Sequence, residues 1–176
     1  RVVKGPDGNG VGPVLEMRDC LRILERSEKR PLGMEETVLD MAAEIFEHNG
    51  KAKKGEGKKI ALEILDTGKA LKKFWDIAKA QGAKQVVKAE DLKAGELTYD
   101  VVSDREGTIK YMWTREIVEI ARALGTPKIK NAGIYIYKMP GEKIKKGDIL
   151  MTLYATTEDR MEEGKKAVNL DELYEL

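Results

Sequence analysis

The sequence predicts an α+β fold, in which an N-terminal helical segment at residues 1–90 precedes a mixed module at residues 91–176. Apolar residues recur every three to four positions in the first half, as in amphipathic helices. Short alternating runs, as in strands, dominate the second half. Apolar residues make up 41% of the 176 residues, so the chain can form a packed core. The boundary between the two parts is expected near residues 88–95.

The first half contains four expected helices, at 12–26, 35–50, 53–68 and 67–82. Their caps and stops are drawn from residues that favour helix ends: Pro13 as a first helical residue, Asn49-Gly50 as a stop, Asp66 or Thr67 as a cap, and Gly82 as a stop. The residues expected to face inward, in chain order, are Val14, Met17, Leu21, Leu24, Val38, Leu39, Ala42, Ile45, Phe46, Ile60, Ile64, Leu65, Leu71, Phe74, Trp75 and Ala78.

These four helices present more apolar surface than they can hide from one another. Each is short, and each carries an apolar stripe of its own. We therefore expect them to cover a part of the protein that lies outside this chain. The chain also begins without Met, in what reads as the middle of a strand at 1–3, and we expect it to be a piece of a longer protein.

The second half is expected to follow the order β-β-α-β-β-α. Its expected strands are 96–103, 107–113, 133–139 and 148–155. A helix at 114–125 should be capped by Thr114 and ended by Gly125. A last helix is expected at 156–168 and a tail at 169–176. Both tryptophans, Trp75 and Trp113, fall at expected core positions.

Composition narrows the function classes. Lys and Arg number 32 and Asp and Glu 31, and their interleaving argues against a nucleic-acid or membrane surface. The single cysteine and single histidine exclude a disulfide within the chain and a Cys/His zinc site. No apolar run approaches about 18 residues, and no signal peptide is visible, so we expect a cytoplasmic protein. The many Lys and Glu residues suit a thermophile surface.

The stretch 138–160 resembles the hairpin of a biotinyl or lipoyl carrier. Such a carrier needs a lysine at the tip that follows the second strand, because that amine is the attachment point. The sequence there is YATTEDR, and Lys145 and Lys146 lie in the preceding turn. This favours a β-hammerhead without carrier chemistry.

The glycine-rich stretch 5–13 precedes a helix, where backbone N–H groups can bind phosphate. Pro13 removes one donor, and no Lys-Ser/Thr follows, so the P-loop pattern fails. The favoured interpretation is that these glycines let neighbouring chain segments approach closely.

The remaining polar candidates also have structural interpretations. The residues Glu16, Asp19 and Glu25 are interpreted as a solvated helix face rather than a catalytic carboxylate pair. His48 in a last helical turn suits the helix dipole better than a role as base. Cys20 is interpreted as a small core residue. The sequence therefore predicts no catalytic, cofactor-binding or metal-binding residue in this chain.

Four stretches together resemble one family. They are GNGVGPVLEMRDCLRIL, LDTGKALKKFWDIAKAQGA, SDREGTIKYMWTREIVEIARALG and GIYIYKMPGEKIKKGDILMTLYA. In this order they are similar to the C-terminal part of thymidine and pyrimidine-nucleoside phosphorylases, especially the archaeal branch, the AMP phosphorylases. The stretch LGTPKIKN departs from the family, whose members often have glycines and arginine there.

The resemblance implies a phosphate-dependent cleavage of an N-glycosidic bond through an oxocarbenium-like transition state. With AMP and inorganic phosphate as co-substrate, the products would be adenine and ribose 1,5-bisphosphate; pyrimidine nucleosides would give base and sugar 1-phosphate. The family's phosphate-binding and base-binding motifs lie upstream of Arg1, so no site residue carries over. Residues 1–90 would be the last helices of the central α/β domain, and 91–176 the α/β-hammerhead domain.

Two function classes remain open. In the first, the chain is a piece of a phosphorylase, inactive alone, whose partners are the missing N-terminal part and other subunits. In the second, it is an autonomous interaction module. Its expected oligomer contacts are Tyr135, Tyr137 and the tail residues Leu170, Leu173, Tyr174 and Leu176.

Overall fold

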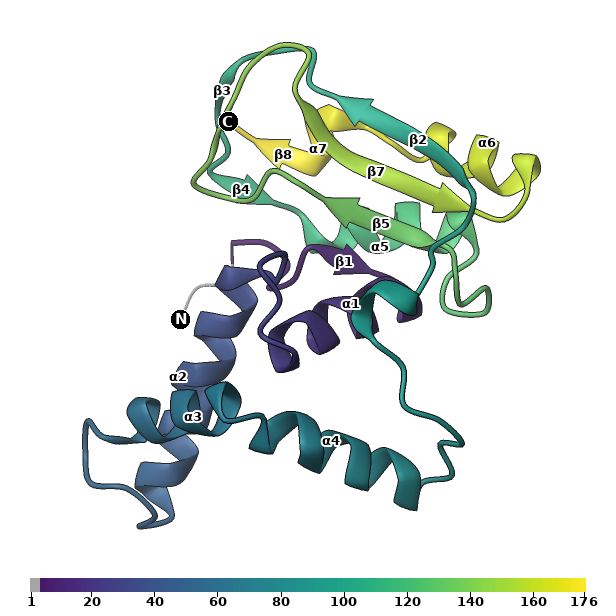
Figure 1. Cartoon of the computed structure of the whole chain (residues 1–176). Helices are drawn as coiled ribbons and strands as arrows, with labels where there is room; N and C mark the ends of the chain where they lie inside the picture. The colour runs from purple at the N-terminus through teal and green to yellow at the C-terminus, as the bar shows by residue number, and fades with distance from the viewer. Residues whose placement is uncertain (1–3) are drawn as a thin grey trace. The chain divides into compact units, whose positions relative to one another are not determined.

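The computed structural model describes residues 4–176, which form two compact units (Figure 1). The first, here called the sheet unit, combines residues 4–17 with Leu92–Leu176. The second, the helical unit, is Arg18–Asp91. The predicted α+β class is confirmed. Residues 4–17 group with the sheet unit because strand β1 (Gly10–Val11) pairs with β5 (Gly133–Ile136), a pairing that the sequence did not indicate.

The sheet unit is built on a four-stranded antiparallel sheet in the order β1-β5-β7-β2. Strand β7 (Ile149–Ala155) lies between β5 and β2 (Leu97–Val102). Its register pairs Thr152 with Tyr135 on one side and with Asp100 on the other. A bulge follows Val101, where the β2 register shifts. Side chains alternate between the faces of such a sheet, so Thr152 shares one face with these two partners.

Two helices cover the opposite face of this sheet (Figure 1). They are α5 (Thr114–Leu124) and α6 (Glu158–Lys166). The core between them and the strands consists of aliphatic side chains that are almost fully buried: Ile117, Ile120, Leu124, Ile134, Ile136, Met151 and Leu153. Gly164 lets α6 approach α5 closely, because a Cβ there would lie 2.4 Å from a methyl carbon of Leu124.

The expected strand at 107–113 is two strands with different partners. Strand β3 (Gly107–Thr108) pairs with β6 (Lys143–Ile144), and β4 (Tyr111–Met112) pairs with β8 (Tyr174–Glu175). The change of partner breaks the alternation that the sequence predicted. Met112 is therefore buried and Trp113 is 48% exposed, so the prediction of a core position for Trp113 was wrong.

The tail packs onto the sheet unit. Helix α7 (Leu170–Leu173) and β8 follow α6, and Leu173 and Tyr174 are buried in the core. The backbone N–H groups of Lys110 and Trp113 donate to the carbonyls of Glu175 and Leu173, at 2.7 and 3.0 Å. The tail is thus held against the sheet unit within the chain itself.

The helical unit contains the C-terminal part of α1 (Pro13–Leu24) and three further helices, α2 (Leu32–His48), α3 (Gly57–Asp66) and α4 (Lys69–Ala80). A short 3-10 turn, η1 (Ala89–Asp91), follows them. Its buried apolar core is small, consisting of Ile23, Leu39, Ala61 and Leu65. Helices α2 and α3 pack closely at Gly57, where a Cβ would lie 2.4 Å from the Ala43 carbonyl oxygen.

Several expected inward-facing residues are on the surface. Met17 in α1, and Val38 and Ile45 in α2, are exposed, while Leu15 and Ala43 are buried instead. Helix α4 has no buried residue, and Trp75 is only half-buried. These stripes were assigned from periodicity alone, which locates an apolar face but not the partner that covers it.

Two predicted helix caps were wrong, in each case because of the backbone conformation at the start of the helix. Trp113, not Thr114, precedes α5, because its extended backbone donates to the tail before the helix begins. Between α3 and α4 the chain turns on Gly68, whose φ of 72° suits glycine, so neither Asp66 nor Thr67 caps α4. Pro13 as a first helical residue and Gly125 as a stop are confirmed. The expected strand at residues 1–3 lies outside the described residues.

Within residues 4–176, no helix combines the length and apolar character that crossing a bilayer requires.

Candidate functional site

The glycine-rich stretch is a close-packed turn in the sheet unit. A Cβ on Gly10 would lie 2.6 Å from the Leu15 carbonyl oxygen, and one on Gly12 would lie 2.5 Å from that of Ala132. Gly12 also has a φ of 116°, which L side chains rarely adopt. These contacts support the structural interpretation of the stretch.

The amide at the start of α1 already has an anionic partner. The backbone N–H of Gly12 donates to Oε1 of Glu16 at 2.9 Å, and Pro13 has no N–H to offer. A carboxylate therefore occupies the position where a phosphate would be held at a helix N-terminus. Glu16 acts as an internal cap.

Asp19 is not on a solvated face, contrary to the sequence-based interpretation. It is 1% exposed, and it lies 3.8 Å from the guanidinium of buried Arg22. Arg22 in turn reaches Glu90, with Nη2 2.8 Å from Oε1. The hydrogen bond from Arg22 lowers the pKa of Glu90, although burial opposes it.

Glu25 ties the same region to the turn η1. Its carboxylate accepts the backbone N–H of Ala89 at 3.1 Å. With the Arg22–Glu90 pair, this bond fixes η1 against α1 within the helical unit. The arrangement anchors a chain segment.

A second ion cluster joins three helices of the helical unit. Buried Glu35 in α2 accepts a hydrogen bond from Arg30 and forms an ion pair with Arg26, which also pairs with Asp66 at the end of α3. Arg26 has a φ of 57°, so the chain turns sharply there after α1. The cluster was not predicted from the sequence, because Arg26, Arg30 and Glu35 are neighbours along the chain but Asp66 joins them only in the folded structure.

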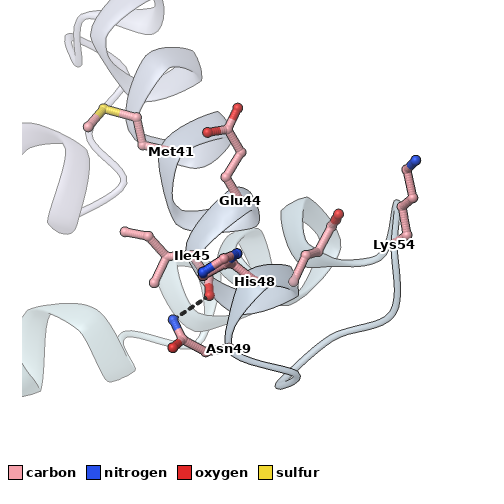
Figure 2. Close-up of a pocket in the computed structure, with 7 residues that line it drawn as sticks. Met41, Glu44, Ile45, His48, Asn49 and Lys54 are labelled. Atoms are coloured by element: carbon pink, nitrogen blue, oxygen red, sulfur yellow. Dashed lines mark hydrogen bonds between the residues drawn. The ribbon is translucent and has the colours of Figure 1, made fainter.

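His48 lies in the last turn of α2 and is exposed. It lines a depression of about 720 Å³ together with Met41, Glu44, Ile45, Glu47, Asn49 and Lys54 (Figure 2). The Asn49 side-chain amide donates to the Ile45 carbonyl at 2.8 Å, which closes the end of the helix. The expected position of His48 at a helix end is confirmed.

The loop after α2 is lysine-rich, but its backbone amides are occupied. The carboxylate of Glu47 accepts the N–H groups of Gly55 and Gly57, at 2.9 and 3.0 Å. Lys58 pairs with Glu36 and Asp40 across α2 and α3, and these bonds, with that to Asp40 first, raise its pKa. The end of the loop is thus fixed by the hydrogen bonds to Glu47, and α3 is joined to α2 by the ion pairs of Lys58.

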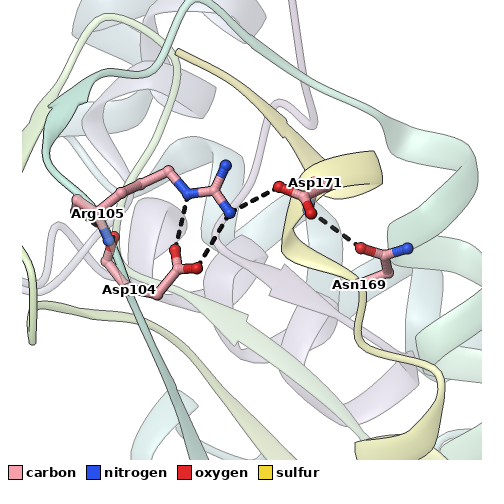
Figure 3. A network of polar contacts seen from close by, with 5 residues as sticks. Asp104, Arg105, Asn169 and Asp171 are labelled. Carbon is pink, nitrogen blue, oxygen red and sulfur yellow. Dashed lines mark hydrogen bonds and ion pairs between the residues drawn. The ribbon is translucent and has the colours of Figure 1, made fainter.

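A polar network in the sheet unit attaches the tail (Figure 3). The guanidinium of Arg105 lies 2.7 Å from Asp104 and 2.7 Å from Asp171, so one cation serves two anions. Asn169 caps the start of α7 by accepting the N–H of Asp171. The hydrogen bond from Arg105 lowers the pKa of Asp104. All of these groups are exposed, and their geometry fits a structural role in holding the tail against the segment that contains Arg105.

Tyr135 and Tyr137 lie at the end of β5 with their rings 5.2 Å apart. Thr152 Oγ1 lies 3.2 Å from the Tyr137 hydroxyl and 2.6 Å from Asp100. Tyr137 is exposed and Tyr135 is half-buried. These are the tyrosines that the sequence singled out for subunit contacts.

Among residues 4–176, no group of three or more His, Cys, Asp or Glu side chains is arranged to hold a metal ion. Cys20 is half-buried rather than part of the core, which corrects its sequence-based interpretation. Strand β7 is followed by Thr156 and Thr157 and then α6, so the described hairpin has no lysine at the carrier position.

Comparison with known proteins now decides the family. Residues 108–171, all within the sheet unit, match the family model described as the pyrimidine nucleoside phosphorylase C-terminal domain. The chain carries the C-terminal domain of the pyrimidine nucleoside phosphorylase family. The resemblance found in the sequence is therefore confirmed, including its likeness to AMP phosphorylases.

The similarity to individual family members extends over nearly the whole chain. AMP phosphorylase 1 of Archaeoglobus fulgidus is 39% identical over 166 residues, which is 94% of this chain and 32% of that protein. The AMP phosphorylase of Methanothrix thermoacetophila is 38% identical over 170 residues, 97% of this chain and 33% of that protein. That of Methanosarcina acetivorans is 38% identical over 157 residues. The chain thus spans about a third of the length of these curated relatives.

Proposed function

We propose that this chain is the C-terminal piece of a phosphorylase that cleaves AMP with inorganic phosphate, giving adenine and ribose 1,5-bisphosphate. The observation that carries the proposal is the similarity of nearly the whole chain to AMP phosphorylases. A pyrimidine nucleoside is the alternative substrate class, since the matching domain model takes its name from pyrimidine nucleoside phosphorylases. Phosphate would be the co-substrate, and no cofactor would be required.

Within that enzyme, we assign this chain a structural role. The candidate groups in residues 4–176 have structural partners: Glu16 caps α1, Glu25 holds η1, and Glu47 holds the α2–α3 loop. Catalysis of this kind depends on positioning an anion and stabilising the departing base. We assign those tasks to the part of the polypeptide outside this chain, so the chain alone should be inactive.

A role in subunit contact is supported by one observation. Tyr137 presents 43% of its surface to solvent beside Tyr135 at the end of β5, a usual composition for a contact surface. The tail residues Leu173 and Tyr174 are buried within the sheet unit, so we no longer assign them to such a contact. An autonomous interaction module is the competing function. We also propose that the protein is cytoplasmic and comes from a thermophilic archaeon.

The test is an assay of phosphorolysis with AMP, CMP, UMP and thymidine as substrates. The quantity measured is the free base released. This chain and the longer protein that contains it are assayed side by side, with phosphate-free reactions as controls. Phosphate-dependent activity on AMP in the longer protein alone is the expected result. Activity of the chain itself would overturn the structural role. A longer protein without phosphorolytic activity on any of these substrates would leave the interaction module as the better account.

A further inference from the structure

Two of the four asparagines in the chain are followed directly by glycine. They are Asn9, in the glycine-rich stretch, and Asn49, at the end of α2. Asparagine is a thermolabile residue, because the backbone nitrogen of the next residue can attack its side-chain amide. Glycine in that next position has no Cβ to shield the nitrogen, and its backbone turns freely. The sequence therefore contains two candidates for spontaneous deamidation, and the structure distinguishes them.

The reaction has the same course at both sites and is described here for Asn49. The Gly50 backbone nitrogen forms a bond to the side-chain amide carbon of Asn49 and gives up its proton, and ammonia leaves. The product is a cyclic succinimide, which water opens at either of its carbonyl carbons to give aspartate or isoaspartate. One water is consumed and one ammonia is released. No electrons are exchanged, so the reaction needs no oxidant, reductant or cofactor.

The reacting groups of Asn49 and Gly50 are exposed and are held by local hydrogen bonds. The Asn49 side-chain amide donates to the Ile45 carbonyl at 2.8 Å (Figure 2), and the Gly50 N–H donates to the Glu47 carbonyl at 3.1 Å. The Asn49 ψ of 9° places the Gly50 nitrogen away from the Cβ that carries the amide. Ring closure therefore requires a backbone rotation at Asn49, which breaks the bond from Gly50. Only the last turn of α2 has to open for this rotation, and helix ends open readily.

Asn9 is held within the sheet unit by bonds to a distant strand. Its side-chain amide donates to the Ile136 carbonyl at 2.7 Å, and its own carbonyl accepts the Ile136 N–H at 2.8 Å. Gly10 is buried in β1, where a Cβ would lie 2.6 Å from the Leu15 carbonyl oxygen. A backbone rotation at Asn9 would therefore separate β1 from β5. Such an opening requires much more free energy than the fraying of a helix end.

We propose that Asn49 is a deamidation site in the folded chain and that Asn9 is protected. The two sites share the same reacting groups, so the difference in rate arises from the structure. Deamidation of Asn49 puts a carboxylate at the C-terminus of α2, where the helix dipole disfavours negative charge. The bond to the Ile45 carbonyl is lost with the amide, so the end of α2 opens further. The reaction needs no catalytic activity of the chain and is independent of the proposed function.

The experiment follows deamidation of the folded chain in mildly alkaline buffer. Tryptic peptides that contain Asn9 and Asn49 are quantified separately by mass spectrometry, from the mass gained when an amide becomes a carboxylate. Isomerisation of Asp7, which also precedes a glycine, leaves the mass unchanged and does not interfere. We expect Asn49 to react at least about tenfold faster than Asn9. The same chain unfolded in guanidinium chloride is the matched control, in which the two sites should react at similar rates.

Equal rates at the two sites in the folded chain, or a faster reaction at Asn9, would overturn the proposal. A difference of the same size in guanidinium chloride would also overturn it, because the neighbouring sequence and not the fold would then be its cause.

A variant that mimics the product tests the effect on α2. The N–H groups of Lys51 and Ala52 both donate to the Phe46 carbonyl, just beyond the helix end. Asn49→Asp should speed hydrogen exchange at these two amides, because it removes the side-chain donor and adds a negative charge. Asn131→Asp makes the same change at an exposed position of the sheet unit and should leave them unchanged. Equal exchange at these amides in both variants would contradict the expected opening of the helix end.

Discussion

Glu35 and Arg26 form an ion pair that is nearly closed to solvent, with Nη1 and Oε1 2.9 Å apart and the Glu35 side chain 9% exposed. The pair lies where α1, α2 and α3 meet in the helical unit. Arg30 donates to the same carboxylate, and Arg26 also reaches Asp66. Glu35 is therefore shared by two guanidinium groups, and Asp66 supplies the second negative charge of the cluster.

Glu35→Ala should destabilise the chain, because it removes the buried anion that two guanidinium groups share and leaves only Arg26 with another carboxylate, that of Asp66. The expected loss is about 2–4 kcal/mol, since removing one partner of a buried pair costs far more than the pair itself contributes. Urea unfolding followed by far-UV circular dichroism measures it. Glu36→Ala is the matched control, one residue along α2 and in an exposed pair with Lys58. A similar loss in both variants would contradict the assigned role of the buried pair.

The contact between Gly57 and Ala43 predicts opposite effects for two glycine substitutions. Gly57→Ala would place a Cβ 2.4 Å from the Ala43 carbonyl oxygen, so α3 must move away from α2. We expect a loss of about 1–3 kcal/mol. Gly33→Ala, in the first turn of α2, meets nothing within 4 Å and should stabilise the helix by up to about 1 kcal/mol. Thermal unfolding of the two variants checks the pair, and a Tm that rises in both would refute the close packing.

The sequence predicted correctly those helix ends that depend on the backbone geometry of a single residue. Pro13 and Gly125 were placed correctly because each acts through its own backbone geometry. The buried state of Asp19 could not be predicted from a solvated-face pattern, because it depends on Arg22 and on the surrounding packing. The predicted core position of Trp113 was wrong for a similar reason. The segment that leads to it pairs first with β6, through β3, and then with β8, through β4. The absence of a catalytic constellation remains a prediction, which the activity measurements test.

The tail should be held by apolar burial rather than by its ion pair. Leu173 is fully buried, whereas the Arg105–Asp171 pair lies at the surface. Leu173→Ala should cost about 2–4 kcal/mol and speed hydrogen exchange at the Lys110 and Trp113 amides, which bond the tail. Asp171→Asn should change both readouts much less, because exposed pairs contribute little. Faster exchange in Asp171→Asn than in Leu173→Ala would reverse this ranking.

Tyr174 predicts a stability change at alkaline pH. Burial raises the pKa of its hydroxyl well above the ordinary value of 10.0. The folded state therefore favours the neutral phenol, and the unfolded state loses its proton first. The stability that this group contributes is complete below pH 10, and it declines as pH rises from there toward the folded pKa, by at most about 1.4 kcal/mol per pH unit.

Tyr174→Phe isolates this effect from the titration of the lysines. Within the described residues, the buried Tyr174 hydroxyl has no hydrogen-bond partner, so its removal should leave stability at pH 7 unchanged or slightly higher. Urea unfolding of the parent chain and the variant between pH 9 and about 11.5 gives the difference in unfolding free energy. That difference should shift in favour of the variant above pH 10. Parallel curves for the two proteins would mean that the hydroxyl reaches water or a partner in solution, and that the tail strand β8 is open where the structure has it closed.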